Sequence, residues 1–428
     1  MPETLADWLK HLEAQHPRGA AGIELGLERV HLISRALGQR QKVPLITVAG
    51  TNGKGSTCAM LESMLRHAGY RVGLYTSPHL LEYNERVQIG GEPLDAGALC
   101  AGFARVEAGR GNTPLTYFEF GTLAAWECFA AAAVDAIIME VGLGGRLDAV
   151  NIYAADCAIV TAVDIDHTDY LGTTREQIGF EKAGIFRSGK PAICADPQPP
   201  QSLVEHARRI AADLRLVGSD FGYRRQERHW QFWSSVEGRP TGHDELPYPA
   251  LHGLPQLQNA SAALAALATL HEHLPVSLPQ IRQGLREARL PGRFQILPGR
   301  PAVVLDVAHN PQAARVLADN LDVLIAQNAA RGKTWAVFGM LRDKDIASVV
   351  AALAGRIEHW LPCSLDGPRA ASAAELSTLL ANAGISAGQM FESPAAAFRH
   401  AHEKAGDDDR ILVFGSFQTV AGVLHELA

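Results

Sequence analysis

An apolar run, Val43–Val48, leads directly into the glycine-rich turn GTNGKGS, Gly50–Ser56, and a segment with helical periodicity follows. Glycines allow backbone N–H groups to point inward around a phosphate, the start of the next helix adds positive potential, and Lys54 supplies a mobile charge. The turn departs from the pattern GxxxxGK[ST], because Val48 stands where the first glycine belongs and Gly55 separates the lysine from the serine. A tight strand-to-helix turn without a ligand is the alternative. The preceding strand and the internal lysine favour a phosphate-binding loop.

Strands and helices continue to alternate after this loop. The segments Arg71–Tyr75, DAIIMEVG and CAIVTAV have the apolar character of buried parallel strands, and Thr122–Ala133 reads as a helix. This alternation predicts an α/β domain with connecting helices on both faces of a parallel sheet. The aromatic-rich stretch Leu214–Pro249 is irregular and predicts a few antiparallel strands at the edge of that domain. An alanine-rich helix is expected from about Gln256 to His271.

A proline- and glycine-rich segment, LPGRFQILPGRP at Leu290–Pro301, marks the expected domain boundary. Beyond it the apolar segments VVLDVAHN, TWAVFGM and ILVFG are separated by alanine-rich helices. We therefore expect a first domain over residues 1–290 and a smaller, Rossmann-like α/β domain over residues 291–428. A chain of 428 residues is longer than one hydrophobic core usually organises, which agrees with two domains.

Composition excludes several classes of partner. The formal net charge of -7 argues against a nucleic-acid or anionic-membrane partner, and no apolar run is long enough to span a bilayer. The N-terminal stretch MPETLADWLKHLEAQH has apolar residues at helical spacing and no cleavable signal pattern. The cysteines are scattered without a CxxC pair, so we expect reduced thiols in a cytoplasmic protein: Cys58, Cys100, Cys128, Cys157, Cys194 and Cys363.

Two strand ends carry candidate metal ligands. Glu140 ends the apolar run AIIME, and a carboxylate there faces the crevice where ligands bind in open α/β sheets. His167 follows the next apolar strand, within the acidic segment DIDHTD. A turn-capping Glu and a hydrogen-bonding His are the alternatives. The phosphate loop favours Mg²⁺, which binds to carboxylates together with phosphate oxygens.

Further candidates lie in both predicted domains. Lys182, in FEKAGIF, reads either as a surface lysine or, given its apolar neighbours, as a partly buried amine with a lowered pKa. LDVAHNP places Asp306 at a strand end with His309 and Asn310 after it, although Asn before Pro is also a common turn former. Arg293 lies in the boundary segment, where it could reach a phosphate.

Nine segments in order resemble one family, the folylpolyglutamate synthase and dihydrofolate synthase branch of the Mur ligase superfamily. They are VAGTNGKGS, YTSPHL, LTYFEFGT, EVGLGGRLDAVN, DIDHTDYLG, EKAGIF, LPGRFQ, LDVAHNP and GMLRDKD. The unusual phosphate loop is itself the form found in this family. The resemblance implies an N-terminal P-loop, Mur-ligase-like ATP-binding domain and a smaller C-terminal Rossmann-like domain.

The resemblance also implies roles for individual residues. ATP contacts would come from Thr51, Asn52, Gly53, Lys54, Gly55, Ser56, Asn259, Arg293 and Asp306. Magnesium ligands would be Ser77, Glu140 and His167, with two ions expected. Lys182 matches a lysine that is carbamylated in relatives, and it joins Lys54 and His167 as a catalytic candidate. The pterin and aminobenzoate parts of the substrate would lie near Thr116, Phe118, Glu119, Arg146, Leu147, Asp148 and Ala149, with the segment GIELGLERV as a further candidate.

The implied reaction joins L-glutamate to dihydropteroate and then to reduced folates. ATP would phosphorylate a carboxylate, and the amine of glutamate would displace phosphate from the resulting acyl phosphate. We expect a monomer that binds these small molecules. The alternatives are a monofunctional folylpolyglutamate synthase, a ligase of cell-wall peptide synthesis, a nucleotide-controlled switch without ligation, and a dinucleotide oxidoreductase. The last lacks a GxGxxG after a strand.

Overall fold

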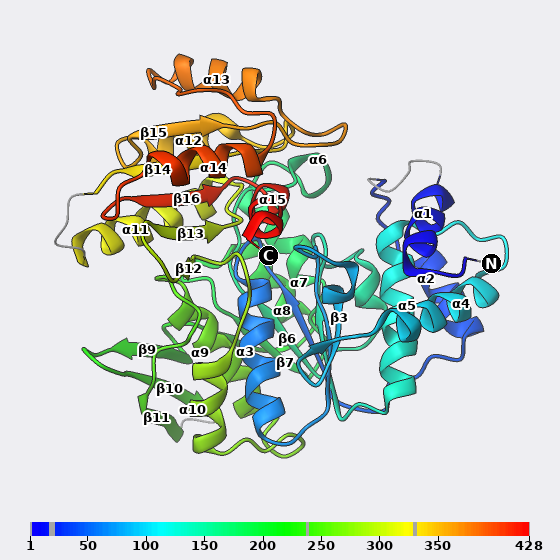
Figure 1. Cartoon of the computed structure of the whole chain (residues 1–428). Coiled ribbons are helices and arrows are strands. Elements are labelled where there is room, and N and C mark those ends of the chain that lie inside the picture. Colours follow the sequence, from blue (N-terminus) through cyan, green and yellow to red (C-terminus); the bar gives the residue numbers. More distant parts are fainter. Residues whose placement is uncertain (1, 17–21, 237–238, 328–331, 428) are drawn as a thin grey trace. The chain divides into compact units, whose positions relative to one another are not determined.

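A computed structural model describes residues 2–16, 22–236, 239–327 and 332–427 (Figure 1). The chain divides into two compact units. The first comprises Met1–Ala250 and Leu257–Arg289, and the second comprises Leu251–Gln256 and Leu290–Ala428. Each unit has its own sheet and its own hydrophobic core.

An eight-stranded sheet organises the first unit, in the order β4-β3-β2-β5-β1-β6-β7-β8. Six neighbouring strands, β2, β5, β1, β6, β7 and β8, run parallel, whereas β3 and β4 are antiparallel additions at one edge. Most parallel strands are buried throughout, as their unbroken apolar sequences predicted. Their bounds are β1 (Leu45–Ala49), β2 (Val72–Tyr75), β3 (Val87–Ile89), β4 (Glu92–Pro93), β5 (Ala136–Glu140), β6 (Cys157–Val160), β7 (Pro191–Cys194) and β8 (Asp213–Leu216).

Helices connect these strands, and several of them begin at a side-chain cap. The expected helix at Thr122 in fact starts at Tyr117, because Thr116 and Glu119 form a reciprocal capping box. The bounds are α1 (Leu5–Gln15), α2 (Glu28–Ala36), α3 (Lys54–His67), α4 (Ala96–Arg110), α5 (Tyr117–Ala132), α6 (Thr168–Leu171), α7 (Arg175–Ala183), α8 (Gln201–Arg209), α9 (Gln256–Thr269) and α10 (Leu278–Glu287), with short 3-10 turns η1 (Tyr83–Arg86) and η2 (Ala149–Ile152).

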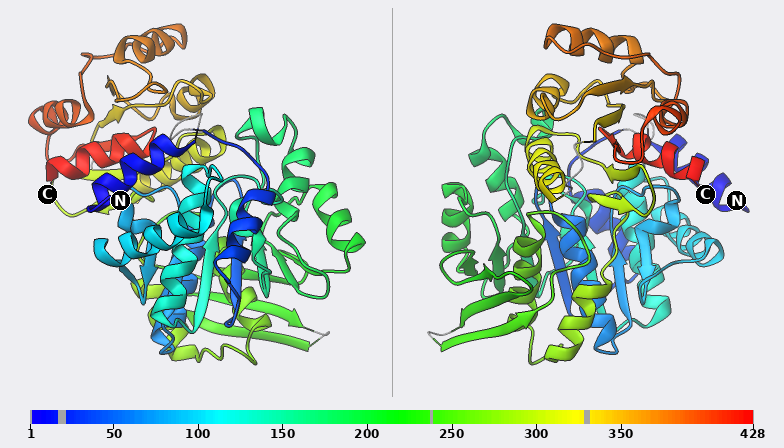
Figure 2. Two further views of the ribbon diagram at one scale, coloured as in Figure 1. Left: turned by 90° about the vertical axis from the view of Figure 1, so that its right-hand side faces the viewer. Right: turned by 60° about the vertical axis from the view of Figure 1, so that its left-hand side comes forward.

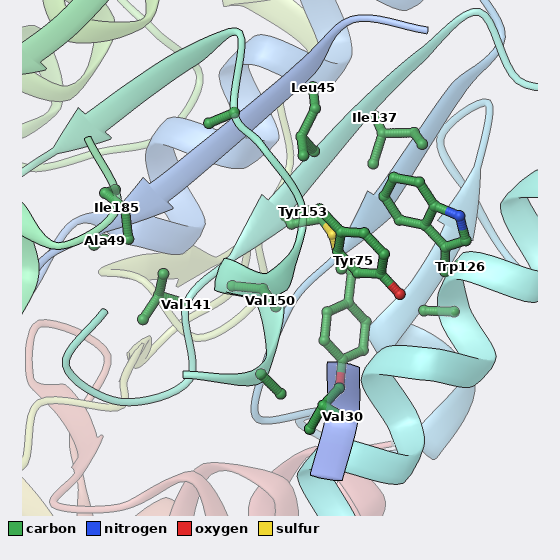
Figure 3. Packing of buried hydrophobic residues seen from close by; sticks show 14 of the residues in the cluster. Val30, Leu45, Ala49, Tyr75, Trp126, Ile137, Val141, Val150, Tyr153 and Ile185 are labelled. Atoms are coloured by element: carbon green, nitrogen blue, oxygen red, sulfur yellow. The ribbon is translucent and has the colours of Figure 1, made fainter. Parts of the chain in front are cut away.

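Close packing fixes the helices on the sheet. Helix α10 lies beside α3 (Figure 1), and a side chain at Gly284 would come within 2.6 Å of Met64, so glycine permits this approach. On the sheet face that includes α5, the rings of Trp126 and Tyr153 stack 3.6 Å apart (Figure 3). These contacts hold the strand ends in fixed positions, as close-packed interiors do.

The aromatic-rich segment forms a separate antiparallel sheet in the order β11-β10-β9 (Figure 2). Its strands are β9 (Phe221–Arg225), β10 (Trp230–Val236) and β11 (Arg239–Leu246). The expected antiparallel strands are confirmed, except that Asp213–Leu216 instead extends the parallel sheet as β8. Trp230 is buried and donates from its indole nitrogen to the Pro247 carbonyl, so the aromatic residues serve a local core.

The second unit has a five-stranded sheet, ordered β12-β13-β16-β14-β15, in which only β12 is antiparallel. Its strands are β12 (Gln295–Leu297), β13 (Ala302–Asp306), β14 (Thr334–Phe338), β15 (His359–Pro362) and β16 (Arg410–Phe414), and its helices are α11 (Pro311–Gln327), α12 (Ile346–Leu353), α13 (Ala373–Asn382), α14 (Pro394–Lys404) and α15 (Phe417–Leu427). The rings of Phe338 and Phe414 stack at 5.0 Å in its core.

Two expectations about the whole chain concern absences. Within the described ranges, no helix is long and apolar enough to cross a membrane. The six cysteines, all of them in described segments, are free thiols.

Candidate active site

The glycine-rich loop follows β1, which lies between β5 and β6 at the centre of the first sheet. In this register Val48 pairs with Glu140 and Ala49 pairs with Val160. The chain therefore leaves three neighbouring strands at the same edge, where ligands bind in open α/β sheets. The loop, the end of β5 and the segment after β6 all converge there.

Two glycines of the loop are required by close approach. A Cβ at Gly50 would lie 1.8 Å from the Thr161 hydroxyl oxygen, and one at Gly53 would lie 2.6 Å from Oδ1 of Asn259. Gly53 also has φ of 90°, which is strained for other residues. Asn259, on α9, thus lies directly against the loop, although it is 206 positions away from Gly53 in the sequence.

The loop is tied to the segment after β6. The Thr51 N–H donates to the Ala162 carbonyl at 2.6 Å, and its hydroxyl donates to the Asp164 carbonyl at 3.0 Å. Thr161 donates to the carbonyl of Asn52 at 2.7 Å. The Lys54 ammonium turns back and donates to the Gly50 and Thr51 carbonyls at 3.1 and 3.4 Å. Because α3 begins at Lys54, its first backbone N–H groups, including those of Gly55 and the buried Ser56, belong to the helix N-terminus.

Ser77 and Glu140 come together at the ends of adjacent strands. The Glu140 carboxylate is 4% exposed and accepts a hydrogen bond of 3.2 Å from the Ser77 backbone N–H. A buried carboxylate beside a phosphate-type loop suits a divalent cation.

His167 lies in the segment after β6, at the start of α6, with a left-handed backbone. Its Nε2 is 3.9 Å from an Asp166 carboxylate oxygen, and its ring is partly exposed. The described residues contain no cluster of three or more His, Cys, Asp and Glu side chains suited to a metal. The set expected from the sequence has only two such side chains, so this result neither supports nor excludes it.

Lys182 is buried in α7, with 3% of its surface exposed. Burial lowers the pKa of its amine to about 7, with Lys54 contributing in the same direction and Asp166 and Asp148 opposing. The sequence left a surface lysine and a partly buried amine with a lowered pKa as alternatives, and the structure supports the buried amine. An amine with this pKa is largely uncharged just above neutral pH.

The loop before η2 packs against the same helix. Arg146 donates to the Glu181 carboxylate at 2.8 Å and its backbone N–H to the Glu181 carbonyl. Asp148 is buried and accepts hydrogen bonds from the N–H groups of Leu143 and Val150. Burial raises the pKa of Asp148 to about 7 despite these bonds and the nearby Lys54. Leu147 and Ala149 flank this carboxyl.

The start of α5 carries the remaining residues that are candidates for binding the pterin and aminobenzoate parts of the substrate. The Glu119 carboxylate accepts from the Thr116 N–H at 2.8 Å and from the Arg29 guanidinium at 2.9 Å. Phe118 lies against the end of β5, where a Cβ on Gly142 would come within 2.7 Å of its ring. The sequence named these residues individually, but the Arg29 ion pair could not be read from it.

Sequence reasoning gave no role to Arg86. Its guanidinium donates to Nδ1 of His79 at 2.8 Å and lies 5.2 and 5.4 Å from the ring centroids of Tyr83 and Tyr117. Burial, together with Arg86, lowers the pKa of His79 to about 4. The only sequence signal was an arginine among aromatic residues close to the motif YTSPHL.

The predicted residues of the second unit cluster at the end of β13. Asp306 accepts from the N–H groups of Phe294 and Ala308, and burial raises its pKa while Arg293 opposes this. The Arg293 guanidinium lies 5.1 Å from the Phe417 ring centroid. The turn interpretation of LDVAHNP is supported, because Asn310 accepts from the Ala313 N–H at the start of α11.

Comparison with known proteins agrees with this arrangement. Residues 48–267 match the Mur ligase middle domain and residues 292–417 match the Mur ligase glutamate ligase domain. The chain is 47% identical over 422 residues to the dihydrofolate synthase/folylpolyglutamate synthase of Escherichia coli, covering 98% of this chain and 95% of that protein. The chain belongs to the dihydrofolate synthase/folylpolyglutamate synthase family. As a member of this family, it is an ATP-dependent ligase with the Mur ligase architecture that the sequence predicted.

Solved structures of dihydrofolate synthase/folylpolyglutamate synthase proteins share the whole fold. E. coli FolC in complex with DHPP and ADP superposes with a TM-score of 0.92 at 45% identity, covering 99% of this chain and 98% of that one. The Yersinia pestis enzyme complexed with AMPPNP and Mn ion gives a TM-score of 0.90 at 46% identity, covering 99% and 98%.

Proposed function

We propose that this protein adds L-glutamate to dihydropteroate, forming dihydrofolate, and adds further glutamates to reduced folates. The observation that carries the proposal is the placement of a phosphate-type loop at the central strand, between the buried Glu140 and the segment that bears His167. Relatives with this fold are named for both activities. We assign residues 1–290 to an ATP-binding domain and residues 291–428 to a glutamate-ligase domain.

In this proposal the ATP phosphates bind to the loop and to the start of α3. The contacts come from Thr51, Asn52, Gly53, Lys54, Gly55 and Ser56, with Asn259, Arg293 and Asp306 as further contributors. Backbone N–H groups and the Lys54 ammonium offset the phosphate charge, which would otherwise repel the acceptor carboxylate. The γ-phosphoryl group moves to that carboxylate, and the glutamate amine then displaces phosphate to form the amide.

Ser77, Glu140 and His167 would hold magnesium. The buried Glu140 carboxylate, hydrogen-bonded by the Ser77 N–H, fits a hard cation that takes oxygen ligands. When bound, the ion neutralises phosphate charge. The family relatives with Mn and AMPPNP support a divalent metal together with a nucleotide.

We further propose that Lys182 carries a carbamate. The neutral amine attacks CO₂, a C–N bond forms, and one proton is released, which converts a neutral side chain into an anion. The lowered pKa of Lys182 supplies the neutral amine that this step needs. The product would place a carboxylate beside Lys54 and would help to hold a second Mg²⁺.

The acceptor side would be built from the start of α5 and the loop before η2. Its residues are Thr116, Phe118, Glu119, Arg146, Leu147, Asp148 and Ala149, together with the N-terminal segment GIELGLERV. The pterin of dihydropteroate needs its own position, because its reacting carboxylate lies one glutamate closer to the ring than in a reduced folate. We propose that the protein acts as a monomer.

An incorporation assay tests the proposal. Purified protein with ATP, Mg²⁺ and L-glutamate should release ADP and form an amide product with dihydropteroate and, separately, with tetrahydrofolate. Thr116→Ala or Asp148→Asn should reduce the dihydropteroate reaction more than the folate reaction. Failure with dihydropteroate alone would leave a monofunctional folylpolyglutamate synthase.

A further inference from the structure

A chain of polar side-chain contacts links the end of α1 to the start of α5. Nε2 of His16 is 3.0 Å from a carboxylate oxygen of Glu24, and the other oxygen of Glu24 pairs with the Arg29 guanidinium. Arg29 then donates to Glu119 at 2.9 Å. The chain ends at Thr116, whose N–H donates to Glu119 at 2.8 Å.

The burial of this chain is uneven. The side chains of His16 and Glu119 are each 4% exposed, whereas that of Glu24, between them in the chain of contacts, is 37% exposed. A half-exposed carboxylate on a loop would adopt several rotamers unless its partners fixed it. Arg29 fixes one oxygen of Glu24, and the buried His16 ring fixes the other.

The segment that contains Glu24 and Arg29 also contacts the loop before η2, which contains Asp148. The Gly26 N–H donates to the Leu147 carbonyl at 3.3 Å. Arg29 additionally donates to the Glu24 carbonyl at 3.2 Å, which folds the segment back on itself. Residues 22–29 therefore join the start of α5 to the loop that contains Asp148.

We propose that His16 is a positioning residue for dihydropteroate, acting through Glu24 and Arg29. This inference rests on the proposed function. His16 orients the Glu24 carboxylate, Glu24 and Glu119 hold the Arg29 guanidinium between them, and that guanidinium shapes the acceptor side used by the shorter substrate. The nucleotide loop and the Glu140 region are not members of this chain of contacts.

The test compares five variants with the wild-type protein: His16→Ala, His16→Gln, Glu24→Gln, His11→Ala and the double variant His16→Ala/Glu24→Gln. His16→Ala removes the donor to Glu24, while His16→Gln keeps a side-chain N–H that can donate. His11→Ala is the matched control, because His11 lies on α1, whose C-cap is His16, but pairs with Glu107 of α4, at 3.3 Å. KM and kcat are measured for dihydropteroate, tetrahydrofolate and ATP, and a thermal melt is recorded for each variant.

The expected result is a selective change in KM. Loss of a hydrogen bond to a charged group should raise KM for dihydropteroate by about tenfold in His16→Ala and in Glu24→Gln. The KM values for ATP and tetrahydrofolate, and kcat at saturating substrate, should stay within about twofold of the wild-type values. His16→Gln should restore most of the lost affinity. The double variant His16→Ala/Glu24→Gln should lose no more than Glu24→Gln alone, since that substitution already removes the charged partner of His16.

Several results would overturn the inference. One is a His16→Ala protein that behaves like His11→Ala. Another is an equal loss of activity with dihydropteroate and with tetrahydrofolate, together with a lower melting temperature. That result would show that His16 has a purely structural role. If His16→Ala does not fold, Glu24→Gln decides, and an unselective effect there rejects the proposal. A wild-type protein inactive with dihydropteroate would reject the proposed bifunctionality as well, whereas an active wild type with indifferent variants rejects only the role of His16.

Discussion

At the scale of single residues, the fold buries two ionisable side chains in places where burial disfavours their charged forms. Lys182 and Asp148 are both almost fully buried in the first unit, and burial moves both pKa values to about 7. The two shifts have opposite signs, because burial disfavours the ammonium in one case and the carboxylate in the other. Groups tuned in this way are typical of active sites.

Replacement of Lys182 by alanine should remove ligase activity, and acetate or formate should restore part of it by standing in for the carbamate. With a pKa of about 7, the neutral fraction of the amine rises from about 10% at pH 6 to about 90% at pH 8. Carbamylation should therefore increase over this interval at fixed dissolved CO₂. Mass measurement under CO₂ and the rescue assay check this. An unmodified lysine in the fully active enzyme would contradict it.

The same lysine should destabilise the protein at neutral pH. Its folded pKa lies below the unfolded value of 10.5, so the unfolded chain binds the extra proton between about pH 7 and 10.5. Stability thus rises with pH across that window and is lowest below about pH 7. In CO₂-depleted buffer, Lys182→Met should raise the melting temperature at pH 7 and have little effect near pH 10.5. Equal effects at both pH values would show that the lysine is not desolvated as described.

Glu140→Ala and His167→Ala should each lower kcat by about 10²–10³-fold, as expected when an electrostatic group is removed from a reacting phosphate. The fold should remain, since Glu140 is the last residue of β5 and His167 lies in the segment after β6, at the start of α6. Asp169→Asn is the control, because Asp169 is exposed in the same acidic segment. Activity is measured at limiting Mg²⁺. A variant that retained normal activity there would remove that residue from the proposed metal site.

At the scale of elements, the turn between β1 and α3 depends on Gly50 and Gly53. Gly69, in the turn after α3, serves as a comparison because its environment is different. All three have φ values above 20°, but Gly69 has open space around it, whereas Gly50 and Gly53 face Thr161 and Asn259. Gly69→Ala should cost about 1–3 kcal/mol of strain and leave nucleotide affinity unchanged. Gly50→Ala and Gly53→Ala should weaken ADP binding by at least about tenfold, which is about 1.4 kcal/mol or more. Calorimetric titration with ADP distinguishes the two effects, and equal affinity in all three variants would contradict the argument.

Elements with a strong local signal were predictable. The β1–loop–α3 unit follows from an apolar run, glycines and a lysine within twenty-five residues of sequence. Strand β15, His359–Pro362, was not predicted, because a short segment with His and Pro has no clear period. The start of α5 was misplaced, because aromatic residues obscured the capping box at Thr116. Contacts such as Arg29 with Glu119 join residues 90 positions apart and leave no trace in a single sequence.

At the scale of the whole molecule, two separate cores predict two responses to core mutations. Ile159 on β6 and Leu412 on β16 are both fully buried, one in each unit. Truncating either to alanine should cost about 2–5 kcal/mol. In scanning calorimetry, Leu412→Ala should lower the transition of the second unit, and Ile159→Ala that of the first. A single transition that moves identically in both variants would show that the units unfold together.

The strand order of the first sheet also separates two tasks across its width. The phosphate loop follows the central β1, and its anchors come from β6 on one side. The proposed acceptor contacts come instead from α5, from the loop after β5 and from the N-terminal segment, on the other side of β1. A change of acid therefore needs new side chains in α5, in the loop after β5 and in the N-terminal segment, while the phosphate loop and the proposed metal ligands at the strand ends can stay as they are. A single scaffold could diversify into ligases for unrelated acids simply by rebuilding that flank.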